Sequence, residues 1–440
     1  MELLRFFTAG NVDDGKSTLI GRLLYDSKSI STDILETLTK QSKSTGVDAD
    51  IDLALLTDGL RAEREQGITI DVAYKYFTTD KRKFIIADTP GHVQYTRNMF
   101  TGASNTDLAI VLVDARHGIT EQTRRHSIIS NIVGIPHVLV CINKMDLVNY
   151  DEEVYNQIKA DYTHFAESLN LKKVSFIPTS ALTGDNVVKH SENLKWYQGP
   201  SLFEFLETVE IEQDFKTQEA RFQVQYVIRP QTEELHDYRG YAGSILSGSF
   251  KKGDKIAVHP VDLTTTIEKI EKFGQEVEEA HAGEPVIIHV ADNIDISRGT
   301  TFVPNTTFVP NTTFVPNTIS ITDGNTIHTP SQSIQTEKTF EAIVCWMDNK
   351  SFQPGQKLLL QQNSFRSKAV IKEIDNKINI YNFKSEPSDG SLHLNDFCKV
   401  TIKTAETLSF DEYANNRKTG SFILINENTN NTVAAGVITS

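Results

Sequence analysis

Short apolar runs alternate with amphipathic stretches along the first half of the chain. Several of these runs are apolar at nearly every position, as in strands that are buried on both faces of a parallel sheet. The predicted strands are residues 3–9, 72–77, 84–87, 108–113, 137–142 and 174–177. Residues 16–24 and 152–169 instead repeat apolar side chains at helical spacing. Alternating strands and helices predict a doubly wound, mostly parallel α/β sheet.

The pattern changes after about residue 212, where strand-like alternation replaces helical spacing. Predicted strands are residues 221–229, 244–250, 255–259 and 285–290, and a second β-rich stretch begins near residue 339. Two all-β modules, each a barrel, are the natural interpretation. We therefore predict an α/β domain over residues 1–212 and β-barrels over residues 219–299 and 339–440.

Between the two predicted barrels, residues 300–317 are three copies of Thr-Thr-Phe-Val-Pro-Asn. A period of six residues is found in β-helices. Three copies are too few for a solenoid, however, and the proline of each copy removes a backbone donor from a sheet. We interpret residues 300–338 as an expanded linker without chemistry of its own.

Composition narrows the functional classes. The chain has 440 residues and a net charge of −14, from 44 basic and 58 acidic side chains. This balance disfavours a protein held mainly by phosphate backbones, so a nucleic-acid partner is not expected. No apolar run approaches the roughly 20 residues that a membrane span needs, and no signal peptide is recognisable at the start. The sequence predicts a cytoplasmic protein without a membrane partner.

Cysteine usage adds little chemistry. The three cysteines, Cys141, Cys345 and Cys398, are widely spaced and odd in number. That arrangement argues against a disulfide framework and against a cysteine-rich zinc site. We interpret all three as buried, small apolar residues.

Residues 10–17 match the phosphate-loop pattern G-x-x-x-x-G-K-[ST] between a predicted strand and a predicted helix, which is the context that the motif requires. Its glycines let backbone N–H groups turn toward phosphate oxygens, and Lys16 reaches the β and γ phosphates. The Ser17 hydroxyl is a predicted Mg²⁺ ligand. The predicted phosphate-binding residues are Gly10, Asn11, Val12, Asp13, Asp14, Gly15, Lys16, Ser17, Thr18 and, from the next motif, Gly91.

Residues 88–92, Asp-Thr-Pro-Gly-His, follow the predicted strand 84–87, which places Asp88 beside the phosphate loop. Asp88 is predicted to hold Mg²⁺ through water, and the Gly91 N–H to approach a γ-phosphate, a contact that exists only with a triphosphate. Upstream, residues 67–70 are Gly-Ile-Thr-Ile. Thr69 alone would be an ordinary strand-edge threonine, but its place between the other motifs predicts a second Mg²⁺ ligand. Thr69 and Asp88 are the predicted switch residues.

Residues 143–146, Asn-Lys-Met-Asp, close the strand 137–142. The Asp146 carboxylate can accept both the ring N–H and the exocyclic amine of guanine, whereas adenine offers no such pair of donors. Residues 179–182, Thr-Ser-Ala-Leu, offer a backbone N–H for the guanine carbonyl. These motifs, in this order and each at a strand end, predict a protein that binds GTP and Mg²⁺. The predicted guanine-binding residues are Asn143, Lys144, Asp146, Ser180, Ala181 and Leu182.

The ordered motifs and the two predicted barrels resemble the translational-factor class of GTPases, with an architecture like that of elongation factor Tu. Within that class the chain is similar to the GTPase (large) subunits of bacterial heterodimeric sulfate adenylyltransferases. Residues 10–24, 53–60, 61–74, 94–99 and 122–126 carry this similarity. Asp14 stands where elongation factors usually have histidine.

The resemblance implies a GTPase subunit whose hydrolysis of GTP drives an adenylyl transfer on a separate, smaller catalytic subunit. That reaction makes adenosine 5′-phosphosulfate and pyrophosphate from ATP and sulfate, the first step of sulfate assimilation. The implied assembly is a heterodimer or larger. The resemblance also implies that His92 orients the attacking water and that Val12 and Ile68 form an apolar gate around it.

One alternative remains open at this point. A translational GTPase that carries aminoacyl-tRNA has the same kind of nucleotide site and the same two barrels. GTP-dependent retention of aminoacyl-tRNA on a filter would favour that carrier over the sulfate enzyme.

Overall fold

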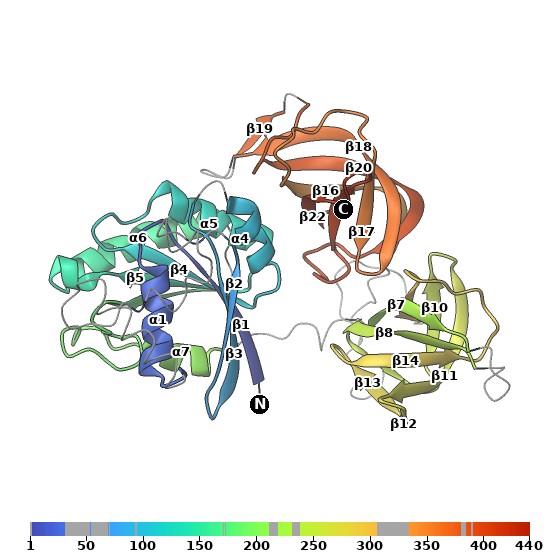
Figure 1. Cartoon of the computed structure of the whole chain (residues 1–440), viewed down its shortest axis with the longest axis horizontal. Coiled ribbons are helices and arrows are strands. Elements are labelled where there is room, and N and C mark those ends of the chain that lie inside the picture. Colours follow the sequence, from blue (N-terminus) through green and yellow to red (C-terminus); the bar gives the residue numbers. More distant parts are fainter. Residues whose placement is uncertain are drawn as a thin grey trace, which may run out of the picture. The chain divides into compact units, whose positions relative to one another are not determined.

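We describe the fold from a computed structural model of the chain, which covers residues 2–30, 53, 69, 71–92, 95–169, 171, 173–210, 219–230, 238–305, 334–379, 384–388 and 390–440. The chain forms two compact units (Figure 1). One consists of Met1–Glu212 with Ile378–Ser385, and the other of Gln213–Lys377 with Glu386–Ser440. Among the residues described, no helix is both long and apolar enough to span a lipid bilayer.

The first unit is built on one twisted sheet with the strand order β2-β3-β1-β4-β5-β6 (Figure 1). Every neighbouring pair is parallel except β2 and β3, which are antiparallel. The predicted doubly wound sheet is therefore confirmed. The strands are β1 Glu2–Ala9, β2 Ala73–Thr78, β3 Arg82–Asp88, β4 Leu108–Asp114, β5 His137–Asn143 and β6 Lys173–Pro178.

Helices cover both faces of this sheet (Figure 1). On one face, Leu19 and Leu23 of the first helix share a core with Phe6 of β1 and Leu202 of the last helix. A side-chain cap marks the start of α6, where the Asp151 carboxylate accepts a hydrogen bond of 2.7 Å from a backbone N–H in the first turn. The helices are α1 Lys16–Asp26, α4 Thr96–Ala103, α5 Glu121–Ile132, α6 Glu152–Ser168 and α7 Leu202–Thr208, and a 3₁₀ turn spans Met145–Val148.

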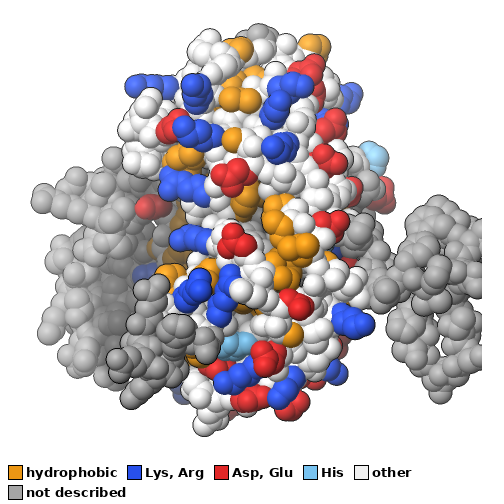
Figure 2. All heavy atoms as spheres, turned by 90° about the vertical axis from the view of Figure 1, so that its right-hand side faces the viewer, with side chains coloured by type: hydrophobic (Ala, Val, Ile, Leu, Met, Phe, Trp, Pro, Cys, Tyr) orange, Lys and Arg blue, Asp and Glu red, His pale blue; other side chains and the backbone are white. Residues whose placement is uncertain are grey.

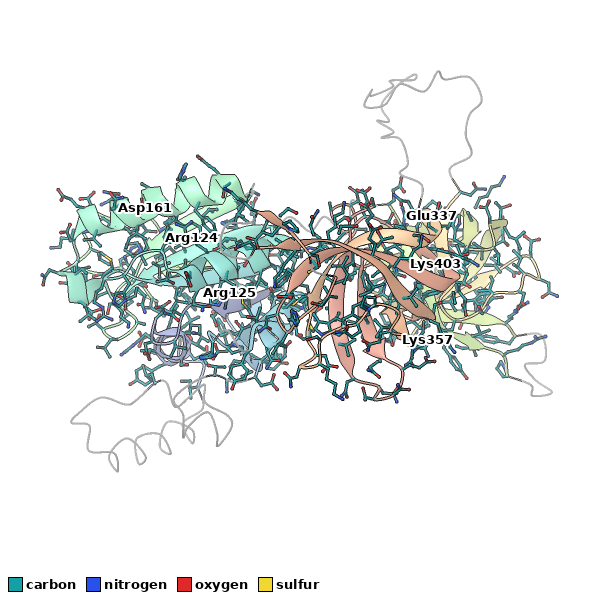
Figure 3. The ribbon with its side chains drawn as sticks, turned by 90° about the horizontal axis from the view of Figure 1, so that it is seen from above. Arg124, Arg125, Asp161, Glu337, Lys357 and Lys403 are labelled. Atoms are coloured by element: carbon teal, nitrogen blue, oxygen red, sulfur yellow. The ribbon has the colours of Figure 1, made fainter. Side chains whose placement is uncertain are left out.

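Helices α5 and α6 are locked together on the opposite face. The guanidinium of Arg124 on α5, which is labelled in Figure 3, lies 4.8 Å from the ring centroid of Phe165 on α6. The hydroxyls of Ser127 and Tyr162 also lie 2.7 Å apart, both buried. This cation–π contact and this hydrogen bond hold α5 and α6 together as one helical layer against the sheet.

The second unit consists of two β-barrels. In the first, β10, β15, β7, β8, β14 and β11 form a ring that the pairing of β10 with β11 closes. In the second, β17, β21, β22, β16, β20 and β18 form a ring closed by the pairing of β17 with β18. The two predicted barrels are therefore confirmed.

The strands of the first barrel are β7 Arg221–Ile228, β8 Gly240–Ser247, β9 Ser249–Lys251, β10 Lys255–His259, β11 Leu263–Lys272, β12 Gln275–Val277, β13 Glu279–His281, β14 Pro285–Val290 and β15 Thr301–Pro304. Those of the second are β16 Gln335–Trp346, β17 Leu358–Gln362, β18 Phe365–Ile378, β19 Ser385–Pro387, β20 Phe397–Phe410, β21 Ser421–Asn426 and β22 Thr432–Ile438. The predicted strand 244–250 is two strands, because the chain turns at Gly248, where φ is 63°.

Buried polar side chains join the two barrels. Arg221 of the first barrel is 3% exposed and donates two hydrogen bonds, of 3.1 and 2.9 Å, to the Asp411 carboxylate of the second. Beside them, the Gln223 amide donates to the Gln362 side chain at 3.2 Å. Arg221 also pairs with Glu219 at 3.1 Å, and the Asp411 carboxylate also accepts a hydrogen bond from the Thr419 hydroxyl, so the pair between the barrels belongs to a buried polar network.

The first copy of the repeated hexad belongs to the first barrel and not to a linker. Strand β15 pairs with both β10 and β7, and the buried ring of Phe302 lies 5.3 Å from that of Phe222. At the other end, β16 begins at Gln335. The linker predicted over residues 300–338 is therefore wrong at both ends. The proline argument failed because Pro304 is the last residue of its strand, where a missing donor costs little. The second and third copies lie outside the described residues.

Because the three hexads are identical, deleting any two leaves the same sequence, with one hexad after Gly299. We expect this deletion to keep the thermal stability and the GTP affinity of the full chain, because the remaining copy supplies β15. Deleting all three removes the strand between β10 and β7, at a cost above the ~3 kcal/mol of losing one buried phenylalanine. Thermal unfolding and GTP titration of both deletions test this. Equal destabilisation by the two deletions would contradict it.

Candidate nucleotide-binding site

The predicted motifs meet at one edge of the sheet in the first unit. The phosphate loop, residues 10–17, follows β1, while Asp88 ends β3 and Asn143 ends β5. Residues 179–182 follow β6. Because these strands are parallel, their carboxyl ends lie together, which is where open α/β sheets bind ligands.

Close packing requires glycine at one position in the phosphate loop and at one position in the segment that packs on it. Gly15 has φ 94°, and a Cβ there would lie 2.6 Å from the side-chain nitrogen of Asn143. That nitrogen donates a hydrogen bond of 2.8 Å to the Asp14 carbonyl. A Cβ at Gly91 would lie 2.4 Å from the Gly10 carbonyl oxygen. The structure thus brings both the Asn143 side chain and the segment after Asp88 against the loop.

Lys16 places its charge inside the phosphate loop. The side chain is buried, and its Nζ donates hydrogen bonds of 2.9 Å to the carbonyls of Gly10 and Asn11. Burial lowers the pKa of Lys16, and the nearby carboxylates of Asp88 and Asp14 oppose that shift. Phosphate oxygens carry negative charge and accept stronger hydrogen bonds from an ammonium than neutral carbonyls do, so they can replace these two carbonyls as its partners.

Asp14 acts on the loop itself. Its carboxylate is buried and accepts a hydrogen bond of 2.6 Å from the Asn11 backbone N–H. Burial raises the pKa of Asp14 above its ordinary value, against that hydrogen bond and the charge of Lys16. The side chain therefore closes the turn of the loop, and any contact of Asp14 with phosphate comes from its backbone. Sequence reasoning did not foresee this role.

Asp88 is anchored beside the loop by two threonines. The Thr8 hydroxyl donates to the Asp88 carboxylate at 3.0 Å, and the Thr89 hydroxyl donates to the Thr8 carbonyl at 2.6 Å. Magnesium in nucleotide sites takes few protein ligands, all oxygen, and completes its shell with phosphate and water. The Asp88 carboxylate and the Ser17 hydroxyl fit that requirement. Thr69 is half-buried, and its neighbour Ile68 lies outside the described residues.

His92 follows Gly91 directly, so its Cα lies ~3.8 Å beyond a backbone atom that packs on the phosphate loop. The side chain is exposed, and its ring centroid lies 6.0 Å from that of Tyr95. The His92 carbonyl accepts a 3.0 Å hydrogen bond from the Tyr95 N–H, which turns the chain into α4. Val12, the member of the predicted gate that the structure describes, is half-buried in the phosphate loop.

Asp146 offers a buried acceptor to a ligand. Its Oδ1 atom is buried and has no hydrogen-bond partner in the described part of the chain. Buried carboxylate oxygens are nearly always hydrogen-bonded, so an orphan here indicates a place for donors from outside the protein. The ring N–H and exocyclic amine of guanine are donors of that kind.

Lys144 is held by a carboxylate that sequence reasoning missed. Its Nζ lies 3.0 Å from the Asp114 carboxylate and also donates to the Asp13 carbonyl. Arg116 donates two hydrogen bonds to Asp114, at 3.0 and 2.7 Å. Burial alone would raise the pKa of Asp114, but these cationic partners hold it well below its ordinary range. The available signal was the position of Asp114 at the end of β4, which matches that of Asp88 at the end of β3.

The segment after β6 folds into a tight loop. Ser180 and Ala181 are buried, whereas Leu182 is exposed. The Ala181 N–H, a predicted donor to the guanine carbonyl, donates to the Asn143 side chain at 2.9 Å. A guanine carbonyl therefore either shares that donor or takes the N–H of Leu182.

Comparisons with known proteins agree with this geometry. A family model described as the elongation factor Tu GTP binding domain matches residues 1–216, and one described as GTP-eEF1A C-terminal domain-like matches residues 339–439. Sulfate adenylyltransferase subunit 1 of Alteromonas mediterranea is 46% identical over 99% of this chain and 87% of its own length. The protein of the same name in Francisella tularensis is 47% identical with the same coverage. The bifunctional enzyme CysN/CysC of Mycobacterium tuberculosis is 47% identical over 99% of this chain and 67% of its own length.

Proposed function

Because this chain belongs to the family of sulfate adenylyltransferase subunit 1, within the GTP-binding proteins related to elongation factor Tu, we propose that its GTP hydrolysis drives sulfate activation on a partner subunit. That activation transfers the adenylyl group of ATP to sulfate and releases pyrophosphate, leaving adenosine 5′-phosphosulfate. The single observation that carries the proposal is the identity of 46–47% along 99% of the chain, which includes both barrels as well as the nucleotide motifs.

The phosphate loop supplies binding and charge for the hydrolysis step. Backbone N–H groups of residues 10–18 and the Lys16 ammonium bind the β and γ phosphates. Ser17, Thr69 and, through water, Asp88 hold Mg²⁺, which supplies positive charge to the phosphate oxygens when bound. The Gly91 N–H bonds the γ-phosphate and releases it after hydrolysis, so the segment after Asp88 differs between the GTP and GDP states.

His92 orients the attacking water, and Val12 and Ile68 flank it on the apolar side. Orientation is a large part of phosphoryl-transfer catalysis, because the transition state needs an in-line nucleophile and little covalent help from the protein. The support for His92 is its exposed side chain immediately after Gly91, whose backbone packs on the phosphate loop.

The partner we propose is a smaller catalytic subunit, in a heterodimer or a larger assembly. The name subunit 1 of the relatives implies that their enzyme has another subunit. We place the reaction in the cytoplasm, where both nucleotide triphosphates are made and consumed.

Product formation tests this function. The purified chain and the small subunit from the same source are mixed with ATP, sulfate and pyrophosphatase-free buffer, together with GTP, GDP or a non-hydrolysable GTP analogue. We expect more adenosine 5′-phosphosulfate to accumulate with GTP than with GDP or with the analogue. Equal final amounts with GTP and GDP would contradict the proposal.

The alternative, a GTPase that carries aminoacyl-tRNA, has the same nucleotide site and barrels. Its support is weaker, because the whole-chain relatives are named for sulfate adenylyltransferase. On the face shown in Figure 2, basic and acidic side chains are intermingled, and the net charge of the chain is −14. Neither feature favours binding of the negatively charged backbone of tRNA. GTP-dependent retention of aminoacyl-tRNA on a filter would revive this alternative.

A further inference from the structure

We propose that Arg22 and Asp185 are positioning residues that hold the guanine loop, residues 180–184, from two sides. Neither side chain is among those predicted to touch the nucleotide. Arg22 ties the guanine loop to the helix that begins in the phosphate loop, and Asp185 ties it to the segment that carries Asp146. The inference rests on guanine-nucleotide binding by this chain and not on the coupling to a partner subunit.

Arg22 reaches the guanine loop from α1. Its Nε donates to the Ala181 carbonyl at 3.3 Å, and a terminal nitrogen donates to the Leu182 carbonyl. Asp26, one turn along α1, lies 3.7 Å from the guanidinium and steadies it. Since α1 begins at Lys16, one rigid helix connects the phosphate end of the site with the base end.

The loop backbone lies directly on this arginine. Gly184 has φ 90°, and a Cβ there would lie 3.2 Å from the Asp26 carboxylate and 3.4 Å from Cδ of Arg22. The Gly184 N–H donates to the Ser180 carbonyl at 2.8 Å and closes the loop. Close approach and a left-handed backbone together explain glycine at this position.

Asp185 holds the other end of the guanine loop. Its carboxylate accepts hydrogen bonds from Tyr150 at 2.8 Å, from Thr183 and Ser191, and from Asn193 at 3.4 Å. Burial alone would raise the pKa of Asp185, but these hydrogen bonds hold it below its ordinary value. A charged acceptor with this many donors fixes the surrounding backbone more firmly than a neutral one.

Through Tyr150, Asp185 also reaches the segment that selects guanine. The Tyr150 N–H donates to the Met145 carbonyl at 2.8 Å, and the Tyr150 carbonyl accepts from the Trp196 indole at 2.9 Å. Met145 immediately precedes Asp146. The hydrogen bond from Tyr150 to Asp185 therefore sets the spacing between the Asp146 carboxylate and the guanine loop, an arrangement that is ready before the base arrives.

The two residues predict different losses of affinity. Arg22→Ala frees the loop whose N–H groups face the guanine carbonyl, and hypoxanthine carries the same carbonyl. We expect Arg22→Ala to weaken the binding of GDP and the binding of IDP by the same factor, about tenfold, as for one lost charge-assisted hydrogen bond.

Asp185→Ala also frees the Asp146 segment, whose contact with the exocyclic amine exists only for guanine. We expect it to weaken GDP about tenfold more than IDP, so that the preference for GDP falls.

The experiment measures GDP and IDP dissociation constants of the full chain by calorimetry, together with thermal unfolding and GTP turnover at saturation. Arg22→Lys and Asp185→Asn, which preserve size, are expected to give intermediate losses. Lys195→Ala and Glu192→Ala are the controls, expected to stay within about twofold of the parent because both change strongly exposed side chains that pair with each other.

Unchanged saturating turnover with weakened binding would separate positioning from a general loss of fold. The inference would be overturned if Arg22→Lys and Asp185→Asn bound GDP and IDP as tightly as the parent while the two alanine variants either kept the parent's affinities or lost affinity only because they unfolded. So would identical GDP-to-IDP ratios for the Arg22 and Asp185 variants. No partner subunit is present, so a failed coupling experiment leaves this result intact, and a failure here leaves the coupling proposal intact.

Discussion

Asp146→Asn is expected to lower the affinity for GTP by about 10²- to 10⁴-fold and to create affinity for xanthosine triphosphate. The carboxylate is expected to accept two hydrogen bonds from guanine, and each one that involves a charged group contributes about 1.5–3 kcal/mol. The amide keeps one acceptor and turns the other into a donor. Xanthine has a carbonyl where guanine has its amine, so the changed pair matches xanthine.

The buried, unpartnered Oδ1 of Asp146 is the structural reason for this expectation. Calorimetric titration with GTP and with xanthosine triphosphate measures the switch. Asp161→Asn, which changes an exposed aspartate of α6, is the control and should alter neither affinity (Figure 3). Tight GTP binding by Asp146→Asn would show that the base is recognised elsewhere.

His92→Ala is expected to lower the rate of GTP hydrolysis at saturation by about 10²- to 10⁴-fold while GTP affinity stays unchanged. The exposed ring comes directly after the Gly91 backbone that packs on the phosphate loop, a place from which it can orient water without itself binding a phosphate. His92→Gln, which keeps a hydrogen-bonding group, should retain part of the rate.

Single-turnover hydrolysis and GTP titration separate the two effects. His164→Ala is the matched control, because His164 is a strongly exposed histidine of α6 on another part of the unit. Full turnover in His92→Ala would refute the role assigned to His92. A large loss of GTP affinity would instead make His92 a binding residue.

The local features of this protein were predictable from its sequence. Strands buried on both faces are nearly continuous in apolar residues, so β4 and β5 were placed within one residue of their ends. The functional residues of the phosphate loop are neighbours in the sequence, and so are those of the segment ending in Asp146. Their chemistry could therefore be predicted from the residue types and their spacing. The strand-like alternation after residue 212 predicted the two barrels, and the resemblance implied the same order of domains.

Features that depend on distant pairing were not predictable. Arg22 and Asp185 meet the guanine loop through contacts that no motif records, and Asp114 is recognisable only once Lys144 is seen beside it. Phe302 was assigned to a linker because the three hexads are identical in sequence. In the structure, the first copy packs its Phe302 ring against Phe222 in the barrel core. In each case the deciding partner lies far away in the sequence.

GTP hydrolysis by the purified chain, measured alone and with the small catalytic subunit, each with and without ATP plus sulfate, tests the central claim most directly. The account predicts slow hydrolysis by the chain alone and a faster rate that requires the partner and both of its substrates, with adenosine 5′-phosphosulfate forming as GTP is consumed. A rate that is indifferent to the partner and to its substrates would contradict it.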